Sequence, residues 1–173
     1  MRLKLFLAPI IAILITTGCY LPISGRVIDA ETNKPIEGAV VLVEWTKTIG
    51  FGLTRTESYK VAEAISDKDG EIRLSGCYSP VVNKPHVTVY KKGYVAWNDE
   101  SIFPALTQRV DFTWGSYVFR LEKFRPEYSY DKHVSFIWSS IREYQNYDAK
   151  KIIINAFEWE RGKAFQERER SRM

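Results

Sequence analysis

The stretch from Ile23 to Val43 constrains the fold of this chain most, because it contains two β-strand patterns joined by a chemically specified turn. Apolar residues recur at every second position in both arms: Val27, Ala39, Val41 and Val43. Between the arms, the segment Glu31 to Pro35 is rich in turn-forming residues. A strand pair with one apolar face needs a second layer to cover that face, so the stretch predicts a β-sandwich.

The composition indicates one globular, β-rich domain with an appendage. Of the 173 residues, 45% are hydrophobic and 27% are charged, which is typical of folded proteins. The aromatic share of 14% suits strands, where aromatic residues pack well on a pleated surface. The formal charge of +4 becomes +2 (4 − 2) if Arg2 and Lys4 are removed with a leader. Proteins that track phosphates usually carry a concentrated basic face, so we expect no nucleic-acid partner.

Residues 1–18 have the pattern of a bacterial export signal. Arg2 and Lys4 supply the positive charge, and the segment Leu5 to Ile15 is apolar apart from the break at Pro9. A transmembrane helix needs about 20 apolar residues, so this segment is too short to span a bilayer and is typical of a signal peptide.

The end of this signal resembles the lipobox of bacterial lipoproteins, because Gly18 directly precedes Cys19. The usual Leu two residues before the Gly is replaced here by Thr16. The resemblance implies that Cys19 carries a diacylglycerol and anchors the protein to a membrane of the cell envelope. Tyr20 stands where an Asp would signal inner-membrane retention in enteric-type bacteria, which favours the outer membrane. The alternative is ordinary cleavage that leaves Cys19 to form a disulfide with Cys77.

The body of the chain shows short strand patterns separated by turn signals. An Asp-Gly turn at Asp67 to Gly70 predicts a hairpin, because Gly supplies positive φ at low cost. The loop Thr46 to Ser58 contains Gly50-Phe51-Gly52 but lacks the third Gly and the helix of a phosphate loop, so we interpret it as a hairpin tip with Phe51 exposed. The expected strands are Leu21 to Ala30, Gly38 to Thr46, Tyr59 to Ser66, Glu71 to Ser75, Val87 to Lys91, Tyr94 to Trp97, Arg109 to Thr113 and Tyr117 to Glu122.

Three motifs make the body similar to the carboxypeptidase regulatory-like domain family. The opening motif is met by Gly25, Val27, Asp29, Thr32, Pro35, Ile36, Gly38, Ala39 and Val41. The second motif is met by Asp67 and Gly70, and the third by Gly93 and Tyr94. The resemblance implies a seven-stranded Greek-key β-sandwich of the prealbumin type over residues 19–125. We expect these motif residues to build the fold: Asp29 accepts bonds from backbone N–H groups, and Asn33 tolerates left-handed geometry.

Residues 126–173 change to a helical period and predict an appendage of two α-helices. Asp131 is the expected N-terminal cap of the first helix. The apolar face of that helix is formed by residues at helical spacing: Val134, Ile137, Trp138, Ile141 and Tyr144. A second helix is expected from about Ala149, ending in a charged, solvated segment from Glu158 to Arg172. These helices either cover a flank of the sandwich or dock a partner protein.

The sequence offers little for catalysis. His86 and His133 have no Cys or carboxylate at zinc-ligand spacing, and the calcium-like start at Asp67 has Tyr78 where a bidentate Glu is required. We expect no enzyme activity, no metal and no cofactor.

Two functions from different classes therefore stay open. The first is a non-catalytic, membrane-anchored lipoprotein that acts as an accessory, structural or protein-interaction module and binds an envelope protein. The alternative is a carbohydrate-binding or small-ligand-binding lipoprotein that stacks its ligand on exposed rings. The aromatic residues considered are Tyr90, Tyr94, Trp97, Phe103, Trp114 and Tyr117, of which Trp97, Tyr94 and Trp114 are the candidate stacking residues. The alternative interpretation is that these aromatic residues pack in the hydrophobic core.

Overall fold

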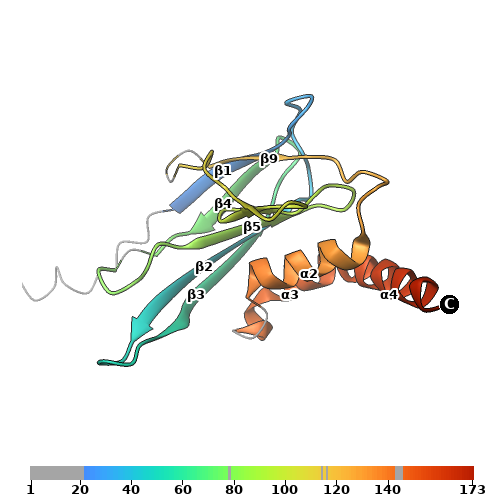
Figure 1. Ribbon diagram of the computed structural model, residues 1–173. Helices are drawn as coiled ribbons and strands as arrows, with labels where there is room; N and C mark the ends of the chain where they lie inside the picture. The colour runs from blue at the N-terminus through green and yellow to red at the C-terminus, as the bar shows by residue number, and fades with distance from the viewer. Residues whose placement is uncertain (1–21, 78, 114, 116, 143–145) are drawn as a thin grey trace, which may run out of the picture.

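The computed structural model describes residues 22–77, 79–113, 115, 117–142 and 146–173. It is mainly β, with a helical region at the C-terminal end of the chain. Two β-sheets lie face to face, and the helices cover the outer face of one of them, so the protein has three layers (Figure 1). Cys19 and Trp114 lie outside the described residues, as does the leader.

The first layer is a three-stranded sheet with β1 (Pro22–Asp29) in the centre. Strand β4 (Glu71–Ser75) pairs with β1 antiparallel, and β9 (Val118–Leu121) pairs with it parallel. The second layer is a four-stranded antiparallel sheet in the order β3 (Arg55–Ile65), β2 (Val40–Ile49), β5 (His86–Tyr90) and β6 (Trp97–Asn98). Strands β7 (Ser101–Ile102) and β8 (Thr107–Gln108) form a small separate hairpin.

The turn after β1 has the predicted chemistry. The Oδ1 atom of Asp29 accepts the backbone N–H groups of Glu31 at 3.0 Å and Thr32 at 2.8 Å, and Asn33 has φ +56°. The turn from Asp67 to Gly70 is also confirmed, with Gly70 at φ +73° and packed so tightly on β1 that a Cβ would run into the Val27 carbonyl oxygen. These two turns therefore meet, and each needs its particular residues. The predicted hairpin around the second turn is wrong, because β3 and β4 lie in different sheets and β4 pairs with β1.

Asp29 also joins two of the motifs, since its Oδ2 atom accepts the hydroxyl of Tyr94 at 3.1 Å. The backbone N–H of Thr32 holds the pKa of Asp29 below its usual 3.8. The carboxylate therefore stabilises the fold fully above pH 3.8, and this contribution is lost as the pH falls through the lowered pKa of the folded state.

We expect Asp29→Asn to flatten the acid limb of the stability curve, because this substitution removes the proton-linked contribution. The measurement is the urea midpoint of unfolding between neutral pH and about one unit below the usual Asp pKa. Tyr94→Phe, which removes a single donor, should change the limb less. If wild type and Asp29→Asn lose stability with acid equally, this linkage is wrong.

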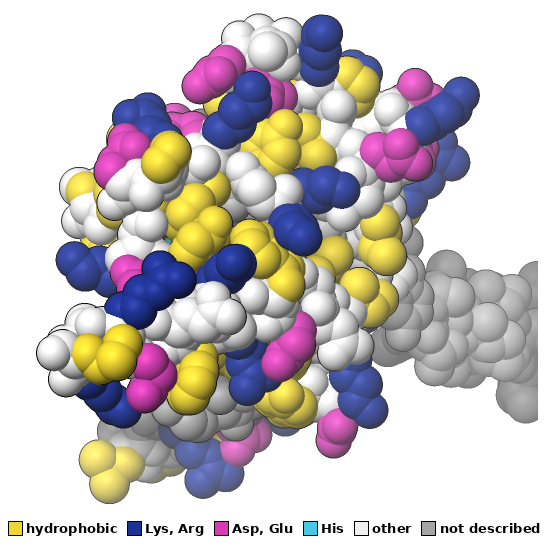
Figure 2. All heavy atoms as spheres, turned by 90° about the vertical axis from the view of Figure 1, so that its right-hand side faces the viewer, with side chains coloured by type: hydrophobic (Ala, Val, Ile, Leu, Met, Phe, Trp, Pro, Cys, Tyr) yellow, Lys and Arg dark blue, Asp and Glu magenta, His cyan; other side chains and the backbone are white. Residues whose placement is uncertain are grey.

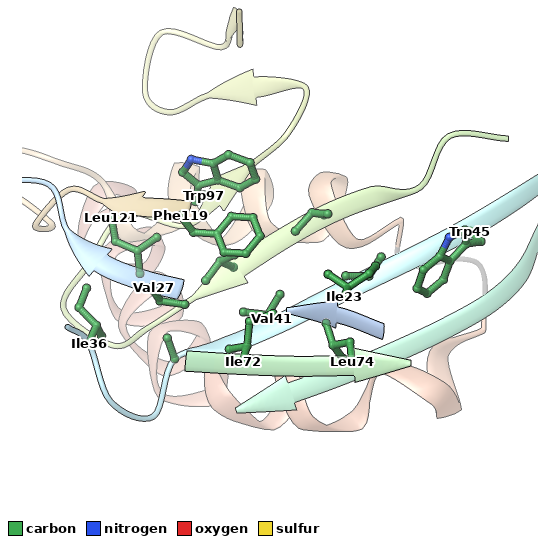
Figure 3. Packing of buried hydrophobic residues seen from close by; sticks show 14 residues of the cluster. Ile23, Val27, Ile36, Val41, Trp45, Ile72, Leu74, Trp97, Phe119 and Leu121 are labelled. Carbon is green, nitrogen blue, oxygen red and sulfur yellow. The ribbon is translucent and has the colours of Figure 1, made fainter. Parts of the chain in front are cut away.

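A first hydrophobic cluster fills the space between the two sheets (Figure 3). Val27, Ile72 and Phe119 come from the three-stranded sheet, while Val41 and Trp45 come from β2 of the other sheet. The alternating residues of the Ile23 to Val43 stretch point into this cluster, as predicted.

A second hydrophobic cluster lies between the outer face of the four-stranded sheet and the helices. Val40 and Leu42 of β2 and Tyr90 of β5 contact it from the sheet, and Ile137 and Phe157 contact it from the helical region. Because one side of β2 enters each cluster, this strand is buried on both faces.

The helical region differs in detail from the prediction of two helices. The structure has α2 (Tyr130–Ile141), a 3₁₀ turn η1 (Tyr147–Lys150), α3 (Lys151–Ala156) and α4 (Glu158–Arg172). The predicted second helix is thus broken at Phe157. The cap of α2 is Ser129, which accepts the N–H of Lys132 at 3.2 Å, and the prediction of Asp131 in this role is wrong.

Two strand predictions are wrong as well. The segment Arg109 to Thr113 forms no strand, and Val110 is 87% exposed. The segment Tyr94 to Trp97 is mainly irregular, with Tyr94 making an isolated bridge to Lys123 and β6 beginning only at Trp97. The loop Thr46 to Ser58 is instead more regular than expected, because the β2–β3 ladder continues to the pair Ile49 and Arg55.

Candidate functional site

The structure places Trp97 in the core, which corrects its proposed role as an exposed stacking residue. The residue is 5% exposed. Its ring makes edge contacts with Phe112 and Phe119, each at 5.0 Å between centroids, and the guanidinium of Arg109 lies 4.5 Å from the ring centroid. Trp97 therefore offers no open face to a sugar or other flat ligand in this structure.

Tyr94 is partly buried, and its hydroxyl is bonded to Asp29. Burial raises the pKa of Tyr94, and the bond to Asp29 adds to that effect. Tyr90 and Phe103 are buried, and Tyr117 is partly buried against the first cluster. The described aromatic residues that were considered for stacking thus belong to the packing of the fold, and Trp114 is not among the described residues.

A groove of about 480 Å³ lies between α2 and the β7–β8 hairpin, and it is the best candidate for a binding site. Its apolar wall is made by Phe103, Pro104 and Leu106 from the hairpin and by Phe136 from α2. Its polar wall includes three serines of α2 and three residues from the end of β6 to the start of β7: Ser135, Ser139, Ser140, Asn98, Glu100 and Ser101.

Several polar groups in this groove already have partners within the chain. The hydroxyl of Ser135 donates to the Asp131 carbonyl at 2.9 Å, and that of Ser139 donates to the Ser135 carbonyl at 3.0 Å. The Oδ1 atom of Asn98 accepts the N–H groups of Glu100 and Ser101. The groove is therefore suited to a ligand that is largely apolar and makes a few hydrogen bonds at its rim.

A cluster of four charged or titratable side chains adjoins the groove through Glu100, which lines it. The Nδ1 atom of His86 is 3.0 Å from Glu100 Oε1 and 3.8 Å from Asp99 Oδ2. On the other side of the ring, Arg142 Nη2 lies 2.8 Å from His86 Nε2 and 3.4 Å from Glu100 Oε1. Arg142 ends α2 in a left-handed conformation, so the cluster links this helix to β5 and to the segment after β6.

The hydrogen-bond pattern indicates a neutral His86. A guanidinium can only donate, so Nε2 must accept, and the ring proton belongs on Nδ1, which faces Glu100. Burial lowers the pKa of His86, and the positive charge of Arg142 lowers it further. Burial raises the pKa of Asp99, whose Oδ1 atom accepts the N–H of Val87 at 2.9 Å. The contact of Nε2 with Arg142 joins His86 of β5 to the end of α2.

Sequence reasoning missed this cluster because it examined only local ligand spacing around His86. The antiparallel register of β5 with β6 pairs Thr88 with Asn98 and therefore brings His86 beside Asp99 and Glu100. A hairpin pairing drawn across Lys92-Gly93 would have predicted this juxtaposition. Arg142 arrives from the helical region, and no local pattern signals it.

Among the described residues, no group of three or more His, Cys, Asp or Glu side chains is arranged to hold a metal ion. In the same part of the chain, no helix is both long and apolar enough to cross a membrane. Cys77 is half-buried against the first cluster and forms no disulfide with another described residue.

The C-terminal side of the molecule carries a mixture of side chains. On the face shown in Figure 2, basic, acidic and apolar groups are interspersed over the described surface. The expectation that the protein has no nucleic-acid partner stays a prediction.

Comparisons with known proteins identify no relatives by sequence: no family model matches the chain, and no curated protein matches it. Among solved structures, a 9R-lipoxygenase from Cyanothece PCC8801 is similar over 79% of this chain, with 11% identity and a TM-score of 0.29. The chain spans 24% of that lipoxygenase chain. A likeness of this strength carries no conclusion about fold or activity.

Proposed function

We propose that this protein is a non-catalytic lipoprotein of the bacterial cell envelope, anchored through acylated Cys19 and acting as an interaction or structural module. The observation that carries the proposal is the position of β1. It begins at Pro22, three residues after Cys19, and is the central strand of its sheet. A folded body that begins so close to its anchor would be held near the lipid surface.

In this proposal, residues 1–18 are a signal peptide, residues 19–125 form the body and residues 126–173 form the helical appendage. The body is assigned to the seven-stranded Greek-key sandwiches of the carboxypeptidase regulatory-like class. Support comes from the contacts among the motif residues, because Asp29 bonds Tyr94 and Gly70 packs on Val27. The absence of Asp after Cys19 favours the outer membrane over the inner one.

The use of the buried titratable groups supports a non-catalytic role. Lys150 of η1 pairs with Glu44 of β2 and so joins the helical region to the four-stranded sheet. His133 of α2 pairs with Glu160 of α4 and joins these two helices. His86 is held between Glu100 and Arg142. Each of these groups has at least one partner that joins the helical layer to the rest of the fold.

The groove beside α2 favours a second candidate function, which is the binding of a small, largely apolar ligand. Its volume of about 480 Å³ lies in the range of ligand pockets, and its apolar wall includes Phe103 and Phe136. In this form the small-ligand alternative no longer depends on stacking against Trp97. Soaking with apolar probes and following chemical shifts of the α2 amides would test it, and shifts confined to other elements would contradict it.

Lipidation is tested by the intact mass of the protein purified from bacterial membranes. We expect the wild-type protein to lack residues 1–18 and to carry acyl groups, and we expect Cys19→Ala to carry none. Multiple acyl chains hold a protein stably on a membrane, since each buried CH₂ contributes about 0.8 kcal/mol. Cys77→Ala is the matched control and should be acylated like the wild type. An unmodified wild-type mass would refute the anchor.

The interaction role is tested separately by pull-down of the tagged protein from detergent-solubilised membranes, with Cys19→Ala as the control. Recovery of a partner only with the lipidated form supports the role. Reproducible absence of any partner argues against it.

A further inference from the structure

We infer that the tip of the β2–β3 hairpin is a second membrane contact, with Phe51 and Leu53 inserted into the lipid interface. Phe51 is 105% exposed and Leu53 is 94% exposed, so the two largest apolar side chains of the tip lie fully in water in the isolated protein. In Figure 1, this hairpin extends well beyond the sandwich. The inference rests on the proposed anchoring through Cys19, because the anchor determines which end of the body faces the lipid.

The tip is a built structure rather than a loose loop. The ladder between β2 and β3 continues through Thr48 and Thr56 to Ile49 and Arg55. Gly50 and Gly52 then turn the chain at φ +108° and +81°, and a Cβ at Gly50 would run into the Leu53 carbonyl oxygen. The turn therefore presents Phe51 and Leu53 outward with little freedom left to lose on binding.

A neighbouring loop braces the same strand. The backbone N–H of Asn83 donates to the Thr46 carbonyl at 2.7 Å, and its side-chain amide donates to the hydroxyls of Thr46 and Thr48, each at 3.2 Å. The projecting end of β2 is thus held from one side by β3 and from the other by this loop. A braced hairpin can hold a pair of apolar side chains at a fixed distance from the body.

The tip lies at the end of the body where the chain leads to Cys19. The start of β1, at Pro22, pairs with Ser75, and Lys60 of β3 donates to the Ser75 carbonyl at 3.0 Å. From Lys60 to Arg55 the strand runs a further five residues, or about 17 Å, to the turn. The three residues from Cys19 to Pro22 reach at most about 11 Å. A membrane that receives the acyl chains of Cys19 therefore lies within reach of the tip.

The charge around the tip favours a lipid surface as its occupant. Next to the turn the hairpin has two basic residues, Lys47 and Arg55, and one acidic residue, Glu57, which pairs with Arg55 at 2.7 Å, so the net charge there is +1. Tyr59 is half exposed on the same hairpin, with the ammonium of Lys47 5.9 Å from its ring centroid. Apolar residues at a tip, flanked by an aromatic ring and basic groups, match the layers of an anionic membrane interface.

The test uses the protein purified from bacterial membranes and reconstituted into vesicles of phosphatidylglycerol and phosphatidylethanolamine. An environment-sensitive nitrobenzoxadiazole label is attached to Phe51→Cys in a Cys77→Ser background. We expect a blue shift of its emission and loss of that emission when the acyl chains of the lipid are brominated. Lys68→Cys, in the turn at the opposite end of the three-stranded sheet, is the matched control and should show neither change.

An emission at position 51 that brominated lipid does not quench would overturn the inference. So would a blue shift that occurs only when envelope proteins are added, because that result identifies a protein as the occupant. The intact mass of the same sample reports acylation independently. Because an unacylated Cys19 would itself take the label, the tip is also measured in a Cys19→Ser, Cys77→Ser background. A quenched tip in an otherwise wild-type protein that carries no acyl groups would contradict only the anchor, whereas an acylated protein with an unquenched tip would contradict only the tip contact.

Discussion

Replacing Lys150 with Met should lower the free energy of unfolding by about 3–5 kcal/mol, which is typical when one partner of a buried ion pair is removed. The side chain of Lys150 is fully buried, and its Nζ atom lies 3.0 Å from Glu44 Oε2. The same ammonium donates to the carbonyls of Ile141 at 2.5 Å and Arg142 at 3.1 Å, at the end of α2. Lys150→Met would leave a buried carboxylate and two helix carbonyls without their donor.

The position of Lys150 explains why the effect should be so large. It ends the 3₁₀ turn before α3, while Glu44 lies in the middle of β2, so one ammonium joins both ends of the helix connection to the sheet. Burial lowers the pKa of Lys150, and the hydrogen bond and charge of Glu44 oppose this shift. The Oε1 atom of Glu44 has no hydrogen-bond partner among the described residues, which adds to the cost of the pair.

A double variant separates the loss of the pair from the loss of packing. Since the pair itself costs desolvation energy, Glu44→Leu with Lys150→Met should recover most of the stability that Lys150→Met loses. Lys151→Met, next in the chain and exposed, is the control and should change stability by no more than about 0.5 kcal/mol. Urea unfolding measures all three variants. A loss below about 1 kcal/mol for Lys150→Met would show that the ammonium is dispensable.

The first motif was predictable because its determinants are local. Asp29, Asn33 and Gly70 each have a conformational reason to occupy a turn, and the structure uses them in that way. The continuous apolar run from Ala39 to Val43 was read as one alternating face. The structure shows that Val40 and Leu42 are also buried, because the helices cover the other face of β2. The continuous apolar run of this strand therefore indicated that a further layer covers its second face.

The segment Arg109 to Thr113 shows where the local pattern fails. Its alternation resembles a strand, but a strand also needs a partner backbone. Arg109 instead donates to the Asn98 carbonyl at 2.6 Å and covers Trp97, while Val110 remains in water. This long-range contact covers the face of Trp97. For that reason the prediction that Trp97 stacks on a ligand is wrong.

The charged segment from Glu158 to Arg172 was predicted to be solvated, and this is correct for most of it. Glu160 and Ala164 are the exceptions, and Glu160 is the charged one, with a fully buried side chain. Its partners, His133 and Tyr90, are 27 and 70 residues away in the chain. No periodicity within the helix distinguishes Glu160 from its neighbours, so a buried charge of this kind becomes visible only when the layers are assembled.

Replacing Glu160 with Leu should lower the free energy of unfolding by at least about 3 kcal/mol, because two buried donors would lose their acceptor. Glu160 Oε2 lies 2.7 Å from His133 Nδ1, and Oε1 accepts the hydroxyl of Tyr90 at 3.1 Å. This hydrogen-bond network extends at both ends. Trp159 Nε1 donates to the Tyr90 oxygen at 2.8 Å, and the Ala96 N–H donates to His133 Nε2 at 2.8 Å.

The direction of the bonds makes the carboxylate the common acceptor. Because Nε2 of His133 accepts from Ala96, the ring is neutral and its proton lies on Nδ1, toward Glu160. Burial raises the pKa of Tyr90 strongly, and the negative charge of Glu160 adds to this rise, so the phenol stays protonated and donates. Tyr90→Phe removes only one of the two donors and should cost less than Glu160→Leu. Glu158→Ala, an exposed neighbour, should cost about 0.5 kcal/mol or less.

A double-mutant cycle decides whether this network acts as one unit. His133→Phe fills the same aromatic surroundings of Phe103, Phe124 and Phe136 but leaves the carboxylate of Glu160 with one donor. Combined with Glu160→Leu, it removes both ends of the bond, so the double variant should be more stable than the sum of the single losses by about 1–3 kcal/mol. Additive losses would mean that His133 and Glu160 contribute independently, and the helical layer would then be held to the sheet by its apolar contacts and by Lys150.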